Sequence, residues 1–396
     1  MDWKRIIIRD NKAEAIRRRH PWIFSGAVLK KDPSLEDGDP VAIYSQGGQL
    51  LGAGHFQQEG GIAVRLLEFG SATAQDLPFW VARLQNAWDY RRRLGLAGNE
   101  QTNAYRLVHG EGDGLPGLII DIYAGVAVIQ CHSAGMYLQR EQIAFALREI
   151  FGTDLTAVYD KSSDTLVRFR HQPVADGYLL GASGPVEVKE YGHRFQVNWE
   201  TGQKTGFFLD QRENRRLLGQ YAAGKKVLNT FSYSGGFSVY ALAAGAQLVH
   251  SVDASKKAIE LADDNVKRNF GAEASHQSFA EDVNRFFKEH PETYDVMIVD
   301  PPAFAKNLSK RHNAVQGYKR LNVSAMQRLA PGGILFTFSC SQVVDMPLFY
   351  HTITAAAIEV GRPVRVMHQL SQPPDHPVSL FHPEGSYLKG LVLQVG

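Results

Sequence analysis

Apolar residues fall in short runs along this chain, and the character of the runs changes from its beginning to its end. In the first seventy residues, short segments rich in β-branched residues are separated by turn sequences such as Glu-Asp-Gly-Asp-Pro at 36–40. The expected strands cover residues 5–9, 41–44, 51–56 and 63–67. This pattern predicts a small β-rich domain over residues 1–70.

In the stretch from 71 to 184, some segments carry apolar residues at helical spacing and others form short strand-like runs. Residues 75–94 and 139–151 carry apolar side chains at helical spacing, which predicts two helices. Around glycine-rich turns we expect strands at 105–108, 118–122, 126–132, 157–160 and 167–170. The stretch therefore predicts a central α+β domain over residues 71–184.

Residues 185–396 alternate apolar runs with helical patterns, after a predicted hairpin at 186–190 and 194–198. The apolar runs are continuous, as in strands that a parallel sheet buries on both faces. The expected strands are 226–230, 248–253, 296–300 and 334–338, with helices between them, one of them at 238–245. These elements predict a doubly wound, Rossmann-like α/β domain.

The composition is that of a globular protein with several domains. The chain has 396 residues, of which 44% are hydrophobic and 21% are charged. Its longest apolar runs, 126–129 and 334–338, are too short to span a membrane, and no secretory signal is visible. We expect a cytoplasmic protein without a membrane partner.

The chain holds two cysteines, Cys131 and Cys340, which exclude a disulfide framework. Neither lies in a Cys/His cluster with zinc spacing, so no metal site is expected. His376 and His382 also lack acids or cysteines at metal-ligand spacing. They are interpreted as hydrogen-bonded loop residues.

Positive charge is concentrated in two stretches, although the formal net charge is only +2. Residues 1–31 carry nine Lys or Arg side chains against three acidic ones. The second stretch lacks acids and holds Lys306, Lys310, Arg311, Lys319 and Arg320. One such run is usually a solvated surface, but two favour contacts with the phosphate backbone of a nucleic acid.

A turn of small residues follows the first predicted strand of the third domain. It reads Ser-Tyr-Ser-Gly-Gly-Phe at 232–237, and the next strand ends in Asp253, about twenty residues further on. Such a turn lets the backbone approach a ligand, and an acid at this distance accepts hydrogen bonds from ribose hydroxyls. The turn lacks Gly-x-Gly-x-x-Gly spacing, which favours S-adenosylmethionine over a dinucleotide. An ordinary tight turn at Gly235 and Gly236 is the alternative. Asp282 is interpreted either as an adenine contact or as a helix N-cap.

Two further strand ends carry reactive side chains. Strand 296–300 ends in Asp300-Pro301-Pro302, a loop that the prolines make rigid, and strand 334–338 is followed by Ser-Cys-Ser at 339–341. Neighbouring parallel strands present their carboxyl ends to one crevice. We therefore expect Asp300, Cys340 and the 232–237 turn to converge.

This pairing suits methylation of carbon 5 of a pyrimidine. Addition of a Cys340 thiolate to ring carbon 6 makes carbon 5 nucleophilic, and a protonated Asp300 can hydrogen-bond ring nitrogen 3. Because a free thiol is mostly protonated at neutral pH, we expect the beginning of a following helix to favour the thiolate. The alternative for Cys340 is a small buried residue at a strand end, which is how Cys131 is interpreted.

At these motifs the sequence resembles the ribosomal RNA large subunit methyltransferase I type of cytosine-5 methyltransferases, over essentially the whole chain. The resemblance rests on the motifs at 20–26 (HPWIFSG), 112–118 (GDGLPGL), 204–212 (KTGFFLDQR), 231–237, 300–302, 337–341 and 385–390 (GSYLKG). It implies a PUA-like RNA-binding β-barrel, a middle α+β domain and an S-adenosylmethionine-dependent methyltransferase domain. The implied partner is large-subunit ribosomal RNA, and a homodimer is left open.

The resemblance also implies roles for single residues. Cys340 is the expected nucleophile, and Asp300 is the acid that faces the ring. The expected S-adenosylmethionine contacts are Gln211, Phe231, Ser232, Tyr233, Ser234, Gly235, Gly236, Asp253, Ala254, Asp282, Asp300 and Pro301. Together with the basic stretches, the expected RNA contacts are Arg17, Arg18, Arg19, Pro302, Phe304, Lys306, Lys310 and Arg311.

Two other functions stay open from the sequence. A methyltransferase acting on the amino group of adenine or guanine uses an acid, two prolines and an aromatic residue, but here Ala303 separates Phe304 from the prolines, and Cys340 would have no role. An RNA-binding protein with a vestigial cofactor site would need no nucleophile. The sequence also leaves open the target cytosine, naked RNA or an assembled subunit as substrate, and the base that removes the carbon 5 proton.

Overall fold

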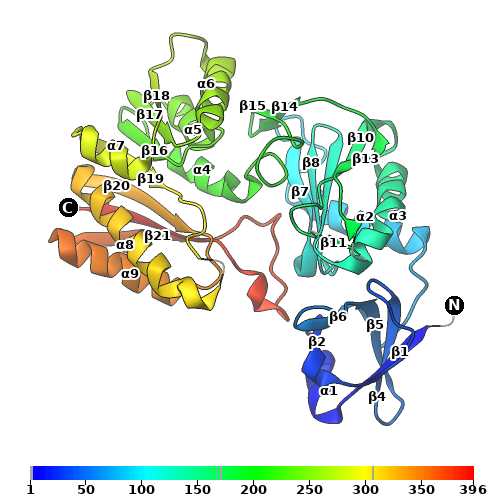
Figure 1. Cartoon of the computed structure of the whole chain (residues 1–396). Helices are drawn as coiled ribbons and strands as arrows, with labels where there is room; N and C mark the ends of the chain where they lie inside the picture. The colour runs from blue at the N-terminus through cyan, green and yellow to red at the C-terminus, as the bar shows by residue number, and fades with distance from the viewer. Residues whose placement is uncertain (1–2, 167, 170–171, 306) are drawn as a thin grey trace. The chain divides into compact units, whose positions relative to one another are not determined.

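Three large β-sheets, of six, five and seven strands, organise the chain (Figure 1). The computed structural model describes residues 3–166, 168–169, 172–305 and 307–396. The chain divides into two compact units. Unit 1 comprises Met1–Lys189, Val197–Leu209 and Pro374–Gly385, and unit 2 comprises Glu190–Gln196, Asp210–Pro373 and Ser386–Gly396. The domain boundaries expected at 70 and 184 stay predictions.

The N-terminal sheet of unit 1 has the strand order β2-β6-β5-β4-β1-β3. Its neighbours pair antiparallel except β1 and β4, which run parallel with Ile6 opposite Ile43. Alternate side chains, such as Ile6, Ile8, Val41 and Ile43, form a buried apolar core. The elements are β1 (Lys4–Ile8), α1 (Asp10–Arg17), β2 (Trp22–Phe24), β3 (Val28–Lys31), β4 (Pro40–Ser45), β5 (Leu50–Phe56) and β6 (Ile62–Phe69).

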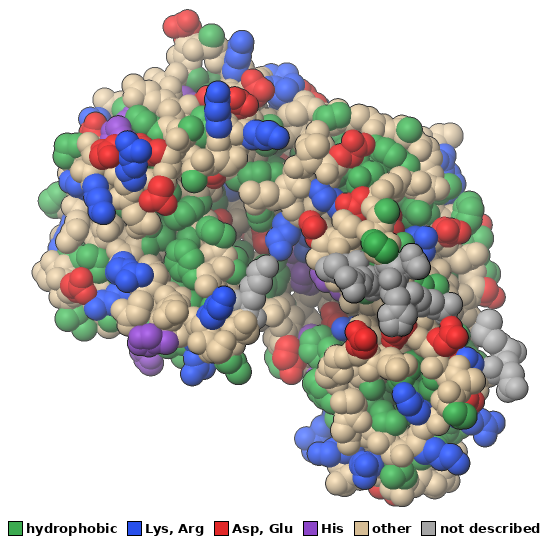
Figure 2. Space-filling model, viewed as in Figure 1, with side chains coloured by type: hydrophobic (Ala, Val, Ile, Leu, Met, Phe, Trp, Pro, Cys, Tyr) green, Lys and Arg blue, Asp and Glu red, His purple; other side chains and the backbone are tan. Residues whose placement is uncertain are grey.

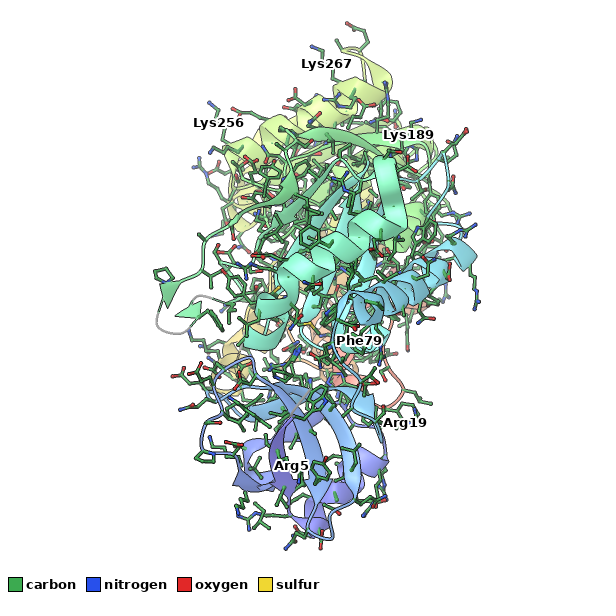
Figure 3. All side chains as sticks on the ribbon, turned by 90° about the vertical axis from the view of Figure 1, so that its right-hand side faces the viewer. Arg5, Arg19, Phe79, Lys189, Lys256 and Lys267 are labelled. Atoms are coloured by element: carbon green, nitrogen blue, oxygen red, sulfur yellow. The ribbon has the colours of Figure 1, made fainter. Side chains whose placement is uncertain are left out.

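The sequence pattern does not predict α1, β2 or β3 of this N-terminal β domain. Helix α1 buries Ala13 and Ile16, so its apolar stripe is too narrow to be recognised among charged residues. Lys and Arg side chains are spread over the visible surface of the domain (Figure 2), and Figure 3 labels Arg5 and Arg19 on it. The basic residues at 17–19 are exposed at the end of α1.

The middle sheet of unit 1 has the order β13-β10-β9-β8-β7, with β9 and β10 parallel and the other neighbours antiparallel. Helices α2 (Leu77–Arg93) and α3 (Ala134–Phe151) begin at Asp76 and Ser133, whose side chains accept backbone N–H bonds. The Ser133 cap is the reason that α3 begins before the expected residue 139. The strands of this sheet are β7 (Ala104–His109), β8 (Leu118–Tyr123), β9 (Val126–Cys131), β10 (Ala157–Asp160) and β13 (Gly177–Gly181). A separate two-stranded antiparallel sheet is formed by β11 (Arg168–Phe169) and β12 (Gln172–Pro173). Residues 167 and 170 of the strand expected at 167–170 lie outside the described residues.

The sheet of unit 2 has the order β18-β17-β16-β19-β20-β22-β21. Its first five strands are parallel, and β22 pairs antiparallel with both β20 and β21. The order reverses between β16 and β19, and open α/β sheets bind their ligands beyond the carboxyl ends of strands at such a point. The strands are β16 (Lys226–Thr230), β17 (Leu248–Asp253), β18 (His276–Ala280), β19 (Tyr294–Val299), β20 (Leu329–Ser339), β21 (Val364–Leu370) and β22 (Lys389–Val395). A separate two-stranded sheet, β14 (Val186–Glu190) and β15 (His193–Val197), forms the expected hairpin.

Helices cover both faces of this seven-stranded sheet (Figure 1). Val227 and Leu228 are adjacent on β16 but belong to different apolar clusters. The cluster of Val227 includes side chains of α4 and α5, and that of Leu228 includes side chains of α7, α8 and α9, which confirms the doubly wound α/β fold. The helices are α4 (Arg212–Leu218), α5 (Gly236–Ala243), α6 (Lys256–Phe270), α7 (Val283–Glu289), α8 (Arg311–Arg328) and α9 (Met346–Val360). Among the described residues, no helix combines the length and the apolar character needed to cross a bilayer.

Candidate active site

Three loops at the carboxyl edge of the seven-stranded sheet carry the residues expected to do chemistry. Strands β16, β19 and β20 are neighbours, and their register places Val299 between Thr230 and Thr337. Asp300 therefore follows β19 at the edge where the 231–235 loop leaves β16. Because Cys340 follows β20 at the same edge, the backbone brings the three loops together.

The loop after β16 has a constrained backbone. Phe231, Tyr233 and Gly235 have φ angles of +55°, +44° and +70°, a region that costs conformational energy for residues other than glycine. The loop is held to the end of β17, since the backbone N–H of Tyr233 donates a 3.0 Å hydrogen bond to Oδ2 of Asp253. Such conformations persist where the surroundings fix them, and they cluster at ligand sites.

Packing within the protein explains the two glycines of this loop. A Cβ atom at Gly235 would lie 2.9 Å from Cβ of Ala262, and one at Gly236 would lie 2.9 Å from Cδ of Arg215. The tight-turn alternative thus accounts for both glycines without the approach of a ligand. Their contact with a cofactor stays a prediction.

Two buried polar atoms in this region fit a polar ligand. Ser232 is 6% exposed and, among the described residues, its Oγ has no hydrogen-bond partner. Oδ1 of Asp210 is likewise buried with no partner in the part of the chain that the structure describes. A buried polar atom without a partner is destabilising. Both atoms therefore fit the hydroxyl and amino groups that S-adenosylmethionine carries.

The two aspartates expected to contact adenosine both bind backbone amides. Oδ1 of Asp253 accepts a 2.9 Å hydrogen bond from the N–H of Ser255, in addition to the bond from Tyr233 at Oδ2. Asp282 is the N-cap of α7 and accepts two backbone N–H bonds of the first turn. The structure thus shows the N-cap alternative for Asp282. Asp282 and Ala254 are exposed, and the cofactor contacts of all three residues stay predictions.

Asp300 is a carboxyl group whose acidity is changed by its surroundings. Burial raises the pKa of Asp300 from 3.8 to about 7, and the negative charge of Asp210 adds to the rise. A 2.8 Å hydrogen bond from Nε2 of Gln211 and the positive charge of Arg215 act in the opposite direction. Near neutral pH the carboxyl is therefore partly protonated and can donate a hydrogen bond.

Gln211 belongs to a hydrogen-bonded set that positions Asp300. Its Oε1 accepts a 2.6 Å hydrogen bond from Nδ2 of Asn214, while its Nε2 is the donor to Asp300. The adjacent Asp210 accepts at Oδ2 a 2.7 Å hydrogen bond from the hydroxyl of Tyr387. The structure shows that Gln211 contacts Asp300. The cofactor contact that the resemblance implies for Gln211 stays a prediction.

A buried ion pair near this set has no signal in the sequence. Arg215 donates from Nε to Oε1 of Glu190 over 2.9 Å and from Nη2 to Oε2 over 2.7 Å. The hydroxyl of Tyr240 donates to the same carboxylate over 3.1 Å. The three side chains come from α4, β14 and α5, so only the folded chain brings them together. Nε of the buried Arg212 also lies 3.4 Å from Oε2 of Glu190, so loss of Glu190 would remove a carboxylate shared by two buried guanidinium groups.

Cys340 is the residue of the Ser339–Ser341 loop that reaches the surface. Ser339 and Ser341 are fully buried, whereas Cys340 is partly exposed and forms no disulfide. This exposure contradicts the alternative of Cys340 as a small buried residue. Cys131 is fully buried, as expected of a core residue, and burial raises the pKa of its thiol.

Lys389 places a buried ammonium group beside Cys340, a feature that the sequence does not predict. Its Nζ donates hydrogen bonds to the carbonyl oxygens of Ser341 over 2.8 Å and Tyr387 over 2.6 Å. Burial lowers the pKa of Lys389 from 10.5 to about 8, and the negative charge of a Cys340 thiolate opposes this lowering. The helix that follows Cys340, α9, begins only at Met346, so its contribution to the thiolate stays a prediction. The cationic neighbour of the thiol is a lysine.

Ser341 joins the two loops that carry the expected nucleophile and acid. Its Oγ accepts a 3.5 Å hydrogen bond from the backbone N–H of Ala305 and lies 3.0 Å from the hydroxyl of Tyr318. The ring of Phe304 packs on that of Tyr318 at a centroid distance of 4.6 Å, and Gly317 leaves room for it. These contacts fix the loop after β19 against the loop after β20.

The residues expected to contact RNA lie in both units. Unit 2 contributes exposed side chains on the loop after β19 and at the beginning of α8, namely Pro302, Phe304, Lys310 and Arg311. Unit 1 contributes the exposed Arg17, Arg18 and Arg19. Lys306 lies outside the described residues, and Pro301, an expected cofactor contact, is buried.

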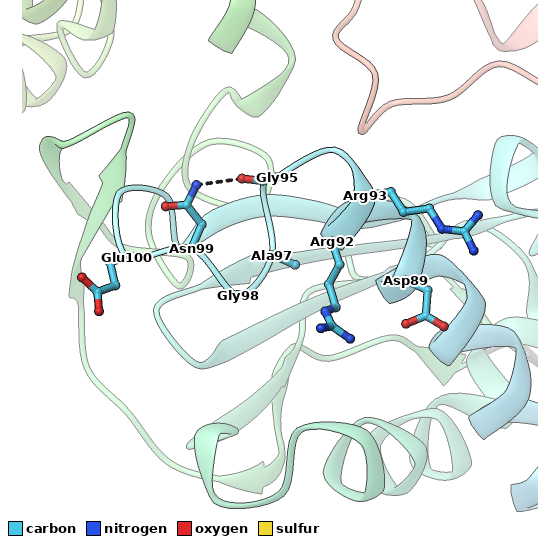
Figure 4. Close-up of a pocket in the computed structure, with 8 residues that line it drawn as sticks. All are labelled: Asp89, Arg92, Arg93, Gly95, Ala97, Gly98, Asn99 and Glu100. Carbon is cyan, nitrogen blue, oxygen red and sulfur yellow. Dashed lines mark hydrogen bonds between the residues drawn. The ribbon is translucent and has the colours of Figure 1, made fainter.

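An open pocket of about 760 Å³ lies in unit 1, and none of the residues expected to be functional lines it. Figure 4 shows Asp89, Arg92 and Arg93 near the end of α2, with Asn99 and Glu100 in the segment that follows. Its two arginines are matched by two acids.

Known families match the two regions of the chain. Residues 105–391 match the S-adenosylmethionine-dependent methyltransferases, and residues 6–69 match a PUA-like domain. Ribosomal RNA large subunit methyltransferase I of Aeromonas salmonicida is 38% identical to this chain, over 98% of each protein. The protein of the same name from Klebsiella pneumoniae is also 38% identical, over 99% of this chain and 98% of the relative.

Solved structures are similar over the same length. A methyltransferase crystallised with SAH has a TM-score of 0.84 and 25% identity, covering 99% of this chain and all of the other. A SAM-dependent methyltransferase from Streptococcus mutans has a TM-score of 0.83 and the same identity and coverage. The fold and the full length of the chain are therefore those of methyltransferases.

Proposed function

Because the chain belongs to the ribosomal RNA large subunit methyltransferase I family of S-adenosylmethionine-dependent enzymes, we propose that it methylates carbon 5 of a cytosine in large-subunit ribosomal RNA. The observation that carries the choice of carbon 5 is the partly exposed thiol of Cys340 at the sheet edge that also carries Asp300. Methylation of an amino group needs no thiol.

S-adenosylmethionine, when bound, supplies an electrophilic methyl group. The 231–236 loop and Asp253 are proposed to hold its adenosine, since this loop leaves β16 at the point where the strand order reverses. Oγ of Ser232 would hydrogen-bond the bound molecule, because no described group of the protein bonds it. Asp282 is proposed to contact the adenine from the beginning of α7.

The proposed reaction begins with the Cys340 thiolate. Its sulfur forms a bond to carbon 6 of cytosine, and the electrons of the double bond between carbons 5 and 6 move toward ring nitrogen 3. Asp300 donates its proton there, so that negative charge does not accumulate on the ring, and carbon 5 becomes an enamine nucleophile. A pKa of about 7 suits this role because the group can hold a proton and release it near neutral pH. Carbon 5 would then take the methyl group as the bond between that group and the sulfur of the donor breaks, leaving S-adenosylhomocysteine. Removal of the carbon 5 proton by an unassigned base lets the thiolate leave, and ring nitrogen 3 returns its proton to Asp300, which restores the aromatic ring.

Lys389 is proposed as a positioning residue for this step. Its ammonium group favours the thiolate of Cys340 over the thiol, because opposite charges in a buried setting stabilise each other. Its bonds to the carbonyls of Ser341 and Tyr387 hold the loop that presents the sulfur.

The exposed arginines of the N-terminal β domain are proposed to bind RNA phosphates, as the match to a PUA-like domain supports. Lys310 and Arg311 would do the same at the beginning of α8. The proposed location is the cytoplasm. Light scattering distinguishes the two oligomeric states left open, a monomer and a homodimer.

The test compares modified nucleosides in ribosomal RNA from cells with and without the gene, by mass spectrometry. The proposal expects one 5-methylcytosine of large-subunit RNA to disappear, and to return with the wild-type gene but not with Cys340→Ala. If cells without the gene instead lack a methylated amino group of adenine or guanine, and the gene for Cys340→Ala restores it, the amino-group alternative is established. An unchanged nucleoside profile, with no calorimetric binding of S-adenosylmethionine, would establish an RNA-binding protein without catalysis.

A further inference from the structure

Two histidines and a glutamate gather in unit 1, and none of them has a role in the proposed methyl transfer. His20 precedes β2, whereas His382 and Glu384 lie in the segment Pro374–Gly385, which belongs to the same unit. One ligand atom from each of the three residues lies within 4.8 Å of the other two. No spacing pattern reveals the cluster, because its members come from opposite ends of the sequence.

The separations are too long for hydrogen bonds and close to those between the ligands of a metal ion. Nε2 of His20 lies 3.7 Å from Oε1 of Glu384, and Nε2 of His382 lies 3.9 Å from Oε2. Hydrogen bonds of this type end at roughly 3.2 Å. Ligand atoms bound to tetrahedral zinc at about 2.0–2.2 Å are about 3.3–3.6 Å apart. The side chain of Glu384 is 55% exposed, so it can make the small movement that closes the site.

His382 gives an independent indication that a ligand belongs here. Its residue is 2% exposed and, among the described residues, neither ring nitrogen has a hydrogen-bond partner. The expectation of a hydrogen-bonded loop histidine is therefore wrong for His382, although it is confirmed for His376, whose Nδ1 lies 3.1 Å from Oδ1 of Asp375. A buried imidazole without partners is destabilising, and coordination through a ring nitrogen removes much of this cost.

The neighbours of the cluster hold the two imidazoles in place. The ring of Trp22 packs against that of His382 at a centroid distance of 4.3 Å. Nδ1 of His20 accepts a 3.2 Å hydrogen bond from the backbone N–H of Trp22 and lies 3.2 Å from the carbonyl oxygen of the same residue, so the backbone of Trp22 holds the imidazole in place. Glu111 accepts a 2.8 Å hydrogen bond from Nε1 of Trp22 and places a second negative charge near the site.

We propose that His20, His382 and Glu384 bind one zinc ion. Two imidazoles and one carboxylate are donors that suit zinc, whereas calcium and magnesium prefer oxygen ligands alone. Water completes the coordination from the side on which Glu384 is exposed. The ion links the residue before β2 to the segment Pro374–Gly385, and it is a structural tie separate from the chemistry at Cys340.

The test uses the full-length chain without a histidine tag, treated with a chelator and titrated with zinc by calorimetry. We expect one zinc per chain and, with cobalt as a spectroscopic probe, the intense visible absorption of a tetrahedral complex. His20→Asn and His382→Asn should each lower the affinity for zinc by more than about tenfold. The matched control is His351→Asn, an exposed histidine on α9, which should bind zinc like the wild type.

Glu384→Gln keeps the test decisive if a histidine variant fails to fold, because its side chain is largely exposed. Zinc should raise the melting temperature of the wild type and of His351→Asn, and should raise that of Glu384→Gln less. Absence of stoichiometric zinc binding by the wild type would overturn the proposal. Equal zinc affinities of Glu384→Gln and His351→Asn would overturn it as well.

Discussion

Gln211 donates a hydrogen bond of 2.8 Å from its amide to Oδ2 of Asp300. The bond stabilises the charged carboxylate, while burial and the charge of Asp210 stabilise the protonated acid. The balance sets the pKa of Asp300 at about 7, so the group is held between its two protonation states at the pH where the enzyme is proposed to act.

Asp300→Asn should change the stability of the chain in a pH-dependent way. Because the pKa of Asp300 is about 7 in the folded chain and 3.8 in the unfolded one, the folded state binds the extra proton between these values. The stability contributed by Asp300 therefore falls as the pH rises through this window. The variant should match the wild type near pH 4 and exceed it by about 2 kcal/mol at pH 8, less than the full shift implies because the carboxyl is partly exposed. Urea unfolding at both pH values measures the difference, and a gain of equal size at both would contradict the prediction.

Cys340→Ala should abolish formation of a covalent complex with RNA. If the target cytosine carries fluorine at carbon 5, no proton can be removed there and the adduct to Cys340 accumulates. A denaturing gel should show this complex with the wild type and with Cys131→Ala, the buried control, but not with Cys340→Ala. Methylation by Cys340→Ala at more than about a thousandth of the wild-type rate would contradict the nucleophilic role.

Lys389→Met should lower activity most at neutral pH. Without the ammonium group, the proposed stabilisation of the Cys340 thiolate is lost, so activity at pH 7 should fall about tenfold and recover as the pH rises. The wild type loses the Lys389 charge above its pKa of about 8, so the two profiles should converge there. Lys389→Arg should keep most of the activity at pH 7. If Lys389→Met lowers activity by the same factor at every pH, Lys389 contributes to activity only through its hydrogen bonds to Ser341 and Tyr387 and not through its charge.

Ser232→Ala should lower the affinity for S-adenosylmethionine without lowering the stability of the folded chain. Its buried Oγ bonds no described group of the protein, so without cofactor the free energy of unfolding should stay the same or rise by about 1 kcal/mol. The affinity for S-adenosylmethionine, measured by calorimetry, should fall about five- to tenfold with the lost hydrogen bond. The control is Ser238→Ala, whose Oγ accepts from Nδ2 of Asn229 over 2.9 Å and lies 2.7 Å from Oγ of Ser251, and which should lower stability instead. Unchanged affinity in Ser232→Ala would remove this residue from the cofactor site.

Replacing Arg17, Arg18 and Arg19 together by alanine should make RNA binding less sensitive to salt. Each phosphate contact contributes about 0.7 to the slope of log affinity against log salt for single strands, so the slope should decrease by about two. Lys256→Ala with Lys267→Ala, both exposed on α6 and labelled in Figure 3, is the control and should leave the slope nearly unchanged. An unchanged slope in the triple arginine variant would exclude these residues from the interface.

Four parallel strands of unit 2, at 226–230, 248–253, 296–300 and 334–338, could be predicted because their signal is local, whereas β21 and β22 were not predicted. The segments 226–230 and 248–253 carry pairs of adjacent apolar residues and precede polar or glycine-rich turns, and β16 and β17 have these bounds. Asp300 and Cys340 stand directly after such runs, so chain order alone places them at one sheet edge.

The surroundings of these residues could not be predicted, because they come from distant parts of the sequence. Glu190 and Arg215 form their ion pair between β14 and α4, and Lys389 reaches Ser341 from β22. Charged residues of this kind are common on surfaces, and only packing decides which of them become buried and paired. The pKa of Asp300 depends on the same packing, so its value has no signal in the sequence either.

Strand β22 lies between β20 and β21 and begins with Lys389. A chain interrupted before residue 389 lacks both the strand that pairs with β20 and the ammonium group beside Cys340. Translation has to pass this point before the sulfur acquires its charged neighbour. A product truncated there lacks the lysine proposed to favour the thiolate, so the proposed site is completed only when the last strand of the sheet has been synthesised.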